Sequence, residues 1–176
     1  MKNKTVGIIG FGNMGSSIAQ GLKSKYPLFV FDKDKNKTKA AQGIKITDSL
    51  VDLAVQSDIL LLAVKPQDFD GVLTELKDKT AGKLIISIAA GITTSYIEKL
   101  LPQARVIRAM PNMPLVIGEG ITALAKGFFA DDNDLKIAVE IFAIFGPAVT
   151  IEKEEFINAV TAISGSGPAY LFYFVM

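Results

Sequence analysis

The sequence predicts an α/β fold in which a mostly parallel sheet carries helices on both faces. Three observations support this prediction. Short apolar runs alternate with segments whose apolar residues recur at helical spacing, the connections between them are short, and residues 59–64 and 84–88 are almost continuously apolar. Uninterrupted apolar runs are typical of parallel strands buried on both faces, and parallel neighbours need crossover connections, usually helices.

Each element follows from its local pattern. Apolar runs predict strands at residues 5–9, 28–31, 59–64, 84–88, 106–107, 121–125 and 148–151, with a short segment at 44–46. Helical spacing or start signals predict helices at residues 14–22, 37–42, from 49, 66–76 and 135–145. Pro66 suits the first turn of its helix, and Ser95 to Glu98 has the spacing of a capping box.

The composition excludes several kinds of chemistry. The 176 residues contain no cysteine and no histidine, which excludes disulfides, thiolate catalysis, cysteine-ligated zinc and histidine-based triads. We therefore expect no metal site, and we expect a cofactor to carry any reaction. The net charge is +1 and no apolar stretch approaches the ~18 residues of a membrane span, so we expect neither a nucleic-acid nor a membrane partner. A cytoplasmic protein is the resulting expectation.

The segment from Gly10 to Gly15 predicts a site for the diphosphate of a dinucleotide. Its glycines fit the pattern G-x-G-x-x-G, follow a predicted strand and open a predicted helix. Gly10 permits a tight turn, Gly12 lets the diphosphate approach the backbone, and Gly15 allows close packing of helix and strand. The alternative is a glycine turn with a purely structural role. The context favours a Rossmann-type fold that binds NAD(H) or NADP(H).

Asp32 ends the next strand, where an acidic residue is expected to bind the adenosine ribose hydroxyls and to favour NAD. Its alternative role is that of a turn and N-cap residue. A 2′-phosphate would be repelled by Asp32 but attracted by Lys33, Lys35 or Lys37. The choice between NAD and NADP therefore stays open at this stage.

Four later segments follow strands at the same edge of the sheet or open a helix. Lys65 follows one strand, and its alternative is an ordinary surface lysine; Gly91 follows the next strand and permits close approach of a ligand. Asn112 lies between two prolines, and its amide can donate and accept toward a ligand or simply form a rigid turn. Residues 164–168 offer hydroxyls and backbone donors at a helix start, or a hinge between helices.

Together these segments resemble the pyrroline-5-carboxylate reductase family. The matching stretches are Ile8 to Gly15, Ala63 to Pro66, Ala89 to Thr93, Arg108 to Pro114 and Ala159 to Tyr170. The resemblance implies transfer of a hydride from NADPH or NADH to the imine carbon of 1-pyrroline-5-carboxylate, which gives L-proline. It implies cofactor contacts at Gly10, Phe11, Gly12, Asn13, Met14, Gly15, Asp32, Lys33, Ala63, Val64, Lys65, Pro66, Ala89, Ala90 and Gly91. Asn112, Ser164 and Ser166 become the candidates near the substrate.

The resemblance also divides the chain. It implies a dinucleotide-binding domain over residues 1–152 and the start of a helical dimerisation domain over 153–176. In the family that second domain supplies a threonine near the imine nitrogen, which has no counterpart before Met176, so the catalytic group stays unassigned. We expect the 176-residue chain to bind cofactor but to turn over little substrate, and the full-length enzyme to be a homodimer or larger homo-oligomer.

Two other functions remain as alternatives. One is a Rossmann reductase of the 3-hydroxyacid dehydrogenase type, against which the Met-Pro-Asn and Ser-Gly-Ser-Gly-Pro segments count. The other is a non-catalytic nucleotide-binding module, because a fold alone does not establish a reaction.

Overall fold

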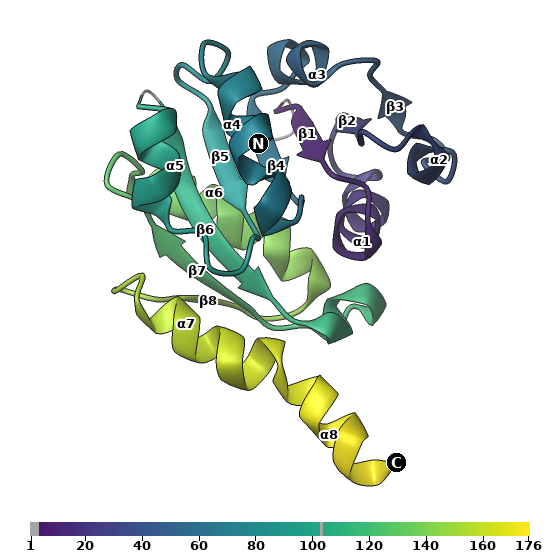
Figure 1. Ribbon diagram of the computed structural model, residues 1–176, viewed down its shortest axis with the longest axis vertical. Coiled ribbons are helices and arrows are strands. Elements are labelled where there is room, and N and C mark those ends of the chain that lie inside the picture. The colour runs from purple at the N-terminus through teal and green to yellow at the C-terminus, as the bar shows by residue number, and fades with distance from the viewer. Residues whose placement is uncertain (1–3, 103) are drawn as a thin grey trace.

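The computed structural model describes residues 4–102 and 104–176, and it confirms the predicted α/β fold (Figure 1). One sheet has the strand order β3-β2-β1-β4-β5-β6-β7-β8. Every neighbouring pair is parallel except β6 and β7, which run antiparallel. The strands are β1 (Val6–Ile9), β2 (Leu28–Phe31), β3 (Lys45–Ile46), β4 (Ile59–Leu62), β5 (Leu84–Ser87), β6 (Arg105–Pro111), β7 (Thr122–Lys126) and β8 (Ala148–Thr150).

Helices and short helical turns connect the strands. They are α1 (Asn13–Leu22), α2 (Lys35–Thr38), α3 (Leu50–Gln56), η1 (Pro66–Asp68), α4 (Phe69–Leu76), α5 (Thr94–Leu100), η2 (Met113–Ile117), α6 (Asp132–Phe142), η3 (Ala143–Phe145), α7 (Phe156–Val160), η4 (Thr161–Gly165) and α8 (Gly167–Val175). None of the helices in the described residues has the length and hydropathy needed to cross a bilayer.

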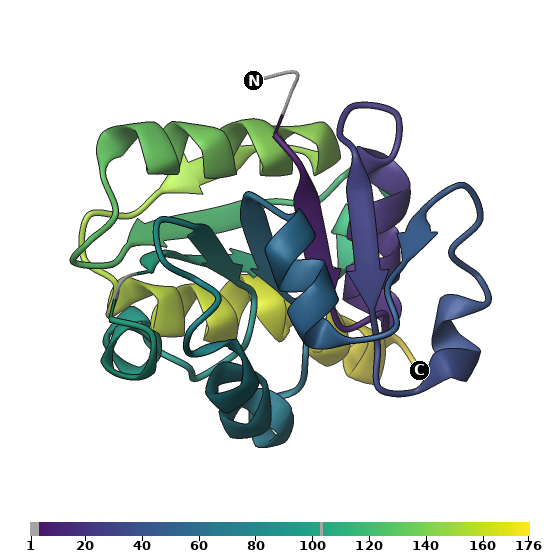
Figure 2. The same ribbon diagram turned by 90° about the horizontal axis from the view of Figure 1, so that it is seen from above.

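Helices cover both faces of the sheet, as Figure 2 shows from above. Helices α1 and α6 pack on one face, and α3, α4 and α5 pack on the other. Strand β4 lies between the two layers: Ile59 and Leu61 belong to one core, Leu60 and Leu62 to the other, and all four are fully buried. This double burial is the physical reason for the continuous apolar run in the sequence.

The strand order reverses between β1 and β4, the two strands that flank the centre of the parallel part of the sheet. Strand β1 continues into α1, and β4 continues into η1 and α4 on the opposite face. Connections that leave to opposite faces open a crevice at the carboxyl ends of these strands. Ligands bind at such switch points in open α/β sheets.

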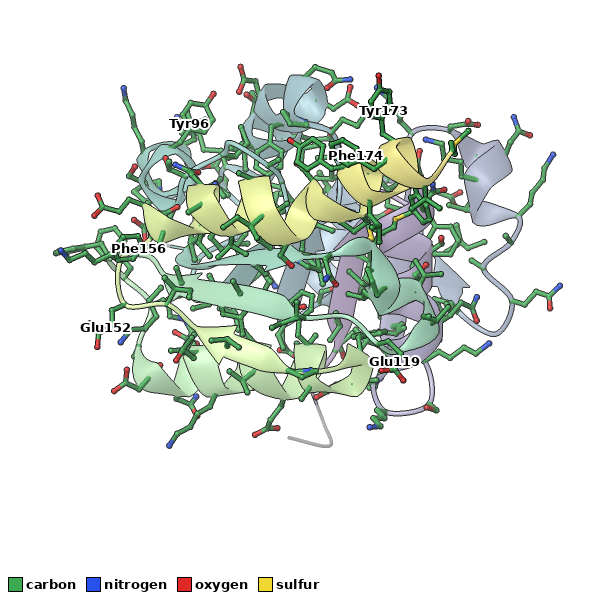
Figure 3. The ribbon with its side chains drawn as sticks, turned by 90° about the horizontal axis from the view of Figure 1, so that it is seen from below. Tyr96, Glu119, Glu152, Phe156, Tyr173 and Phe174 are labelled. Atoms are coloured by element: carbon green, nitrogen blue, oxygen red, sulfur yellow. The ribbon has the colours of Figure 1, made fainter. Side chains whose placement is uncertain are left out.

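Of the last two helices, α7 lies against the sheet and α8 extends away from it (Figure 1). Helix α7 packs on β7 through Ile157, which is buried against Ala123 and Ala125. A π-helical turn, η4, follows, and α8 then extends away with apolar side chains in solvent. Figure 3 labels two of them, Tyr173 and Phe174, which are 82% and 83% exposed.

The structure corrects several expected boundaries. The expected helix at 37–42 is α2, which begins at Lys35 after the cap Asp34 and ends at Thr38. The expected helix at 135–145 begins at Asp132, because its N-terminal turn is polar and precedes the apolar repeat. The strand expected at 106–107 runs from Arg105 to Pro111, since β7 pairs with it along Ile107 to Pro111.

The capping box predicted at Ser95 was wrong. Helix α5 begins at Thr94, and the side chain of Thr93 caps it by accepting a hydrogen bond from the Tyr96 N–H at 3.2 Å. The Glu98 carboxylate does not reach back to a cap. It accepts instead from the N–H of Phe129 at 3.2 Å, in the turn after β7, a partner that local spacing cannot reveal.

Candidate functional site

The glycine turn between β1 and α1 combines tight packing with open space. Gly10 has φ +96°, which favours glycine, and a Cβ on Gly15 would overlap the carbonyl oxygen of Gly10. A Cβ on Gly12 would meet nothing within 4 Å. Gly10 and Gly15 are therefore needed by the fold itself, whereas the space beside Gly12 is available to a ligand.

The start of α1 is suited to bind an anion. Gly12 is the N-cap, and no side chain among the described residues caps this helix. The first-turn N–H groups, including those of Asn13 and Met14, have no partner within the helix by geometry. Together with the helix dipole they favour a phosphate at this position.

A cavity of about 720 Å³ opens beside this helix start, at the crevice where the strand order reverses. Seven predicted cofactor residues line it: Gly10, Gly12, Asp32, Lys33, Ala63, Val64 and Lys65. The sequence did not indicate a second group of lining residues from η1 and α4, namely Gln67, Asp68, Gly71, Val72 and Glu75. Gln67, Asp68, Gly71 and Glu75 have the polar or small side chains of an ordinary solvent-exposed helix face, and Val72 belongs to the apolar stripe that packs on the core, so local pattern carries no signal of a ligand site.

Asp32 has a structural role that the sequence only partly indicated. Its Oδ2 accepts from the Phe11 N–H at 2.7 Å and its Oδ1 accepts from the Asp34 N–H at 2.8 Å. Lys37 Nζ lies 3.6 Å from the same carboxylate. The buried carboxylate thus braces the glycine turn, and contact with a ribose remains a prediction.

Lys33 projects at the mouth of the same cavity. Its Nζ lies 2.5 Å from Asp68 of η1, and this hydrogen bond raises the pKa of Lys33. Lys33 and Lys37 together place two cations beside the Asp32 carboxylate. The end of the cavity next to β2 therefore contains charges of both signs.

The other predicted cofactor residues lie outside the cavity lining. The Phe11 side chain is buried in the core on the α1 face, and Pro66 begins η1. Ala89 is buried, whereas Ala90 and Gly91 are exposed in the loop after β5, with Gly91 at φ +77°. Their role as cofactor contacts remains a prediction.

The structure places the turn at residues 110–112 (Met-Pro-Asn) against residues 164–166 (Ser-Gly-Ser). Asn112 Oδ1 accepts from the Ile121 N–H at 2.9 Å, and its Nδ2 donates to Ser164 Oγ at 3.2 Å. The N–H of Ser166 donates to the Thr161 carbonyl at 2.9 Å, which closes the π-helical turn. Asn112 and Ser164, 52 residues apart in sequence, are thus neighbours, and their contact with a substrate remains a prediction.

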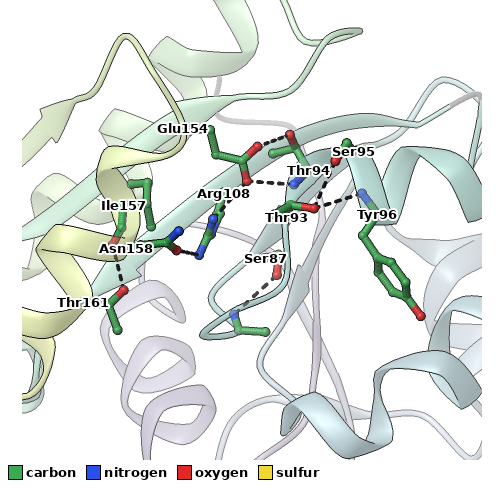
Figure 4. Close-up of polar contacts among 11 residues, drawn as sticks. Ser87, Thr93, Thr94, Ser95, Tyr96, Arg108, Glu154, Ile157, Asn158 and Thr161 are labelled. Carbon is green, nitrogen blue, oxygen red and sulfur yellow. Dashed lines mark hydrogen bonds and ion pairs between the residues drawn. The ribbon is translucent and has the colours of Figure 1, made fainter.

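Arg108 lies in β6 rather than in the loop after it, and its side chain is buried beneath α7 (Figure 4). Nη1 lies 3.2 Å from Glu154, and Nη2 donates to Asn158 at 3.0 Å. Glu154 also accepts from the N–H of Thr94 at 2.8 Å and from its hydroxyl at 2.6 Å. The sequence indicated none of these partners, although a lone arginine in an apolar strand requires a buried acceptor.

These residues fit a dinucleotide. The uncapped helix start and the open space at Gly12 suit a diphosphate, the lysines and Asp32 suit the ribose end, and the cavity leads along the strand ends. A cavity of this size is within the usual range for cofactors.

Comparisons with known proteins agree with this geometry. Residues 5–91 match a family model described as NADP oxidoreductase, coenzyme F420-dependent. The chain is 40% identical to a pyrroline-5-carboxylate reductase of Methanosarcina acetivorans, over 98% of this chain and 67% of that protein.

Solved structures of the same enzyme share the fold. One from Coxiella burnetii has a TM-score of 0.91 at 34% identity and one from Plasmodium falciparum, with NADP bound, has 0.89 at 32%. The matches cover 98% and 99% of this chain and 67% of each solved chain. This chain therefore spans about two thirds of the length of these relatives. The identity, coverage and shared fold agree: the chain belongs to the pyrroline-5-carboxylate reductase family.

Proposed function

We propose that the protein reduces 1-pyrroline-5-carboxylate to L-proline with NADPH or NADH. The observation that supports this most strongly is the cavity at the strand switch point, which joins the uncapped start of α1 to the ends of β2 and β4. The named activity of the relatives supplies the substrate.

Different residues bind different parts of the cofactor. The backbone at Gly12 to Met14 holds the diphosphate, and Asp32 keeps this turn in place through the Phe11 N–H. Lys33 and Lys37 face the adenosine ribose. When bound, the reduced nicotinamide supplies a hydride to the imine carbon, a proton from solvent or the protein completes the amine at nitrogen, and proline results. The loop at 89–91 and the Asn112–Ser164 pair flank the reacting end.

We further propose a cytoplasmic protein that forms a homodimer or larger homo-oligomer. The exposed apolar side chains of α8 support association, since patches of this kind are uncommon on soluble monomers. The relatives are named for a reaction of metabolism, which supports a cytoplasmic location.

Cofactor binding is tested on the 176-residue chain by the fluorescence of NADPH and NADH on titration. We expect saturable binding of at least one of them, and loss of binding in the variant Gly12→Val, whose side chain fills the open space. A folded wild-type chain that binds neither cofactor would contradict the proposal.

Turnover is tested in a chimaera in which residues 1–176 replace the matching part of the Methanosarcina acetivorans relative. We expect oxidation of NADPH or NADH that depends on 1-pyrroline-5-carboxylate, with the unaltered relative as control. Gel filtration and circular dichroism check that the chimaera folds. A folded chimaera that binds cofactor without reducing the substrate would favour a non-catalytic nucleotide-binding module.

The 3-hydroxyacid dehydrogenase alternative is not favoured. A 3-hydroxyisobutyrate dehydrogenase of Mycobacterium tuberculosis shares the fold with a TM-score of 0.72, but at 15% identity the likeness extends to the fold alone. Assay of the chimaera with 3-hydroxyacids and NAD should show no turnover.

A further inference from the structure

The Glu154 carboxylate bonds to two elements that lie far from it in sequence. Its Oε1 accepts from the N–H of Thr94 and its Oε2 from the hydroxyl, 60 residues away, while Nη1 of Arg108 lies 3.2 Å from Oε1 (Figure 4). Both carboxylate oxygens are therefore used, and the contacts join the connection before α7 to the start of α5 and to β6.

On one side the carboxylate fixes the loop after β5. This loop, residues 88–93, begins beside Ser87, whose Oγ accepts from the Ala89 N–H at 3.3 Å. The next residue, Thr94, is the first of α5, and Glu154 holds Thr94 through two hydrogen bonds. The exposed residues between these two anchors include Ala90 and Gly91.

On the other side the carboxylate fixes α7. The Arg108 guanidinium donates to Glu154, just before α7, and to Asn158, four residues later within α7. A single side chain therefore fastens the beginning of α7 to β6. Helix α7 continues directly into η4, where Ser164 meets Asn112. The bonds of Arg108 to Glu154 and Asn158, together with the buried Ile157, therefore hold the segment that carries Ser164.

The Arg108–Glu154 ion pair is largely buried. The Arg108 side chain is 2% exposed and the Glu154 side chain 21%, and Nε of Arg108 has no hydrogen-bond partner within residues 4–102 and 104–176. Removing the carboxylate would leave a buried cation without its counter-charge, which is strongly destabilising. Substitution of Glu154 alone should therefore disturb the contacts among Arg108, Thr94 and α7.

We propose that Glu154 is a positioning residue that holds the loop at 88–93 and the α7–η4 segment in register across the carboxyl edge of the sheet. The proposal rests on the proposed function, in which the loop at 89–91 and Ser164 flank the two reactants. A carboxylate that secures both segments keeps the distance between hydride donor and acceptor constant. Glu154 does not line the cavity described above.

The first test uses hydrogen exchange in the 176-residue chain and needs no activity. In Glu154→Gln we expect exchange at Thr94 and in the loop at 88–93 to rise about tenfold, the effect of losing a hydrogen bond to a charged group. The control is Glu155→Gln, which removes the same charge from the next, exposed residue. Unchanged exchange at 88–94 relative to that control would overturn the proposal.

Thr94 offers a milder pair of variants that keeps Arg108 and Glu154 together. Thr94→Val removes the hydroxyl and keeps the shape of the side chain, whereas Thr94→Ser restores the hydroxyl. We expect increased exchange in the first and near wild-type exchange in the second. Equal behaviour of the two would contradict the role of the Glu154–hydroxyl bond. This pair also decides the matter if Glu154→Gln does not fold.

The second test measures turnover in the chimaera described above. We expect Glu154→Gln to lower kcat by about 10- to 100-fold, as misplaced reactants do, while the Kd of NADPH changes less than about twofold. A loss of stability with unchanged kcat per folded molecule would show a purely structural role and overturn the proposal. If the unaltered chimaera is inactive, the proposed function fails, and the exchange experiment still decides whether Glu154 holds the loop.

Discussion

The Asp32 carboxylate accepts a hydrogen bond of 2.7 Å from the backbone N–H of Phe11, which lies in the middle of the glycine turn. This contact links the end of β2 to the connection between β1 and α1, two segments that are 21 residues apart. The residue that the sequence assigned to a ribose is therefore also part of the scaffold that shapes the diphosphate site.

Asp32→Ala should destabilise the chain and weaken cofactor binding together. Loss of a buried, charged acceptor leaves the Phe11 N–H unsatisfied, which costs about 1.5–3 kcal/mol of unfolding free energy. Urea unfolding and NADPH titration measure the two effects. Asp34→Ala, which removes only the exposed cap of α2, is the control and should leave cofactor affinity unchanged.

Gly12→Ala and Gly15→Ala should separate binding from folding. A Cβ on Gly12 meets open space, so the free energy of unfolding should fall by less than about 1 kcal/mol while NADPH affinity falls at least about tenfold. A Cβ on Gly15 overlaps Gly10, so this variant should lose about 1–3 kcal/mol or more. Thermal unfolding and fluorescence titration check both, and equal losses of stability would contradict the assignment.

Lys33→Ala should weaken NADPH more than NADH. Lys33 faces the cavity at the end that would receive the ribose, and a 2′-phosphate carries more negative charge than a hydroxyl. We expect the ratio of the two dissociation constants to shift by about threefold toward NADH at low salt and less at high salt. Lys35→Ala, whose residue does not line the cavity, is the matched control. An equal loss of affinity for NADPH and NADH would mean that the 2′-phosphate does not lie near Lys33.

Glu98→Gln should stabilise the chain at neutral pH. Burial, with the nearby Glu154 charge, raises the pKa of Glu98 above its ordinary 4.5, so the folded state favours the protonated form. The ionised carboxyl therefore costs stability at neutral pH; that cost shrinks as the pH falls through the folded-state pKa and is gone below the ordinary value of 4.5. We expect a rise in Tm of about 2 °C at pH 7 and none below about pH 4. Glu152→Gln, at an exposed residue, should show neither effect.

Much of the fold could be predicted from the sequence because its patterns are local. The continuous run in β4 reflects burial on both faces, and the glycines at 10, 12 and 15 mark a turn that spans only six residues. The boundaries of α5 and α6 were less predictable, since polar caps precede the apolar repeat that marks each helix, and α2 contains no apolar residue to mark it.

The candidate site was predictable in part for the same reason. Gly10, Gly12, Lys33 and Lys65 follow directly from strand ends and the glycine pattern, and the cavity contains them. Asp68 and Glu75 could not be found in this way, because only the tertiary structure brings η1 and α4 beside the ends of β1 and β2.

By itself, the sequence determined the alternation of strands and helices, the glycine turn and the absence of histidine and cysteine, which leaves the reaction to a cofactor. Only the tertiary structure decided that Arg108 is buried, that Asn112 meets Ser164, and that Glu154 secures Thr94. Local periodicity records neighbours within a helix or strand. These partners lie 46 to 60 residues apart and meet only because the order of strands in the sheet brings β6, α5 and α7 together.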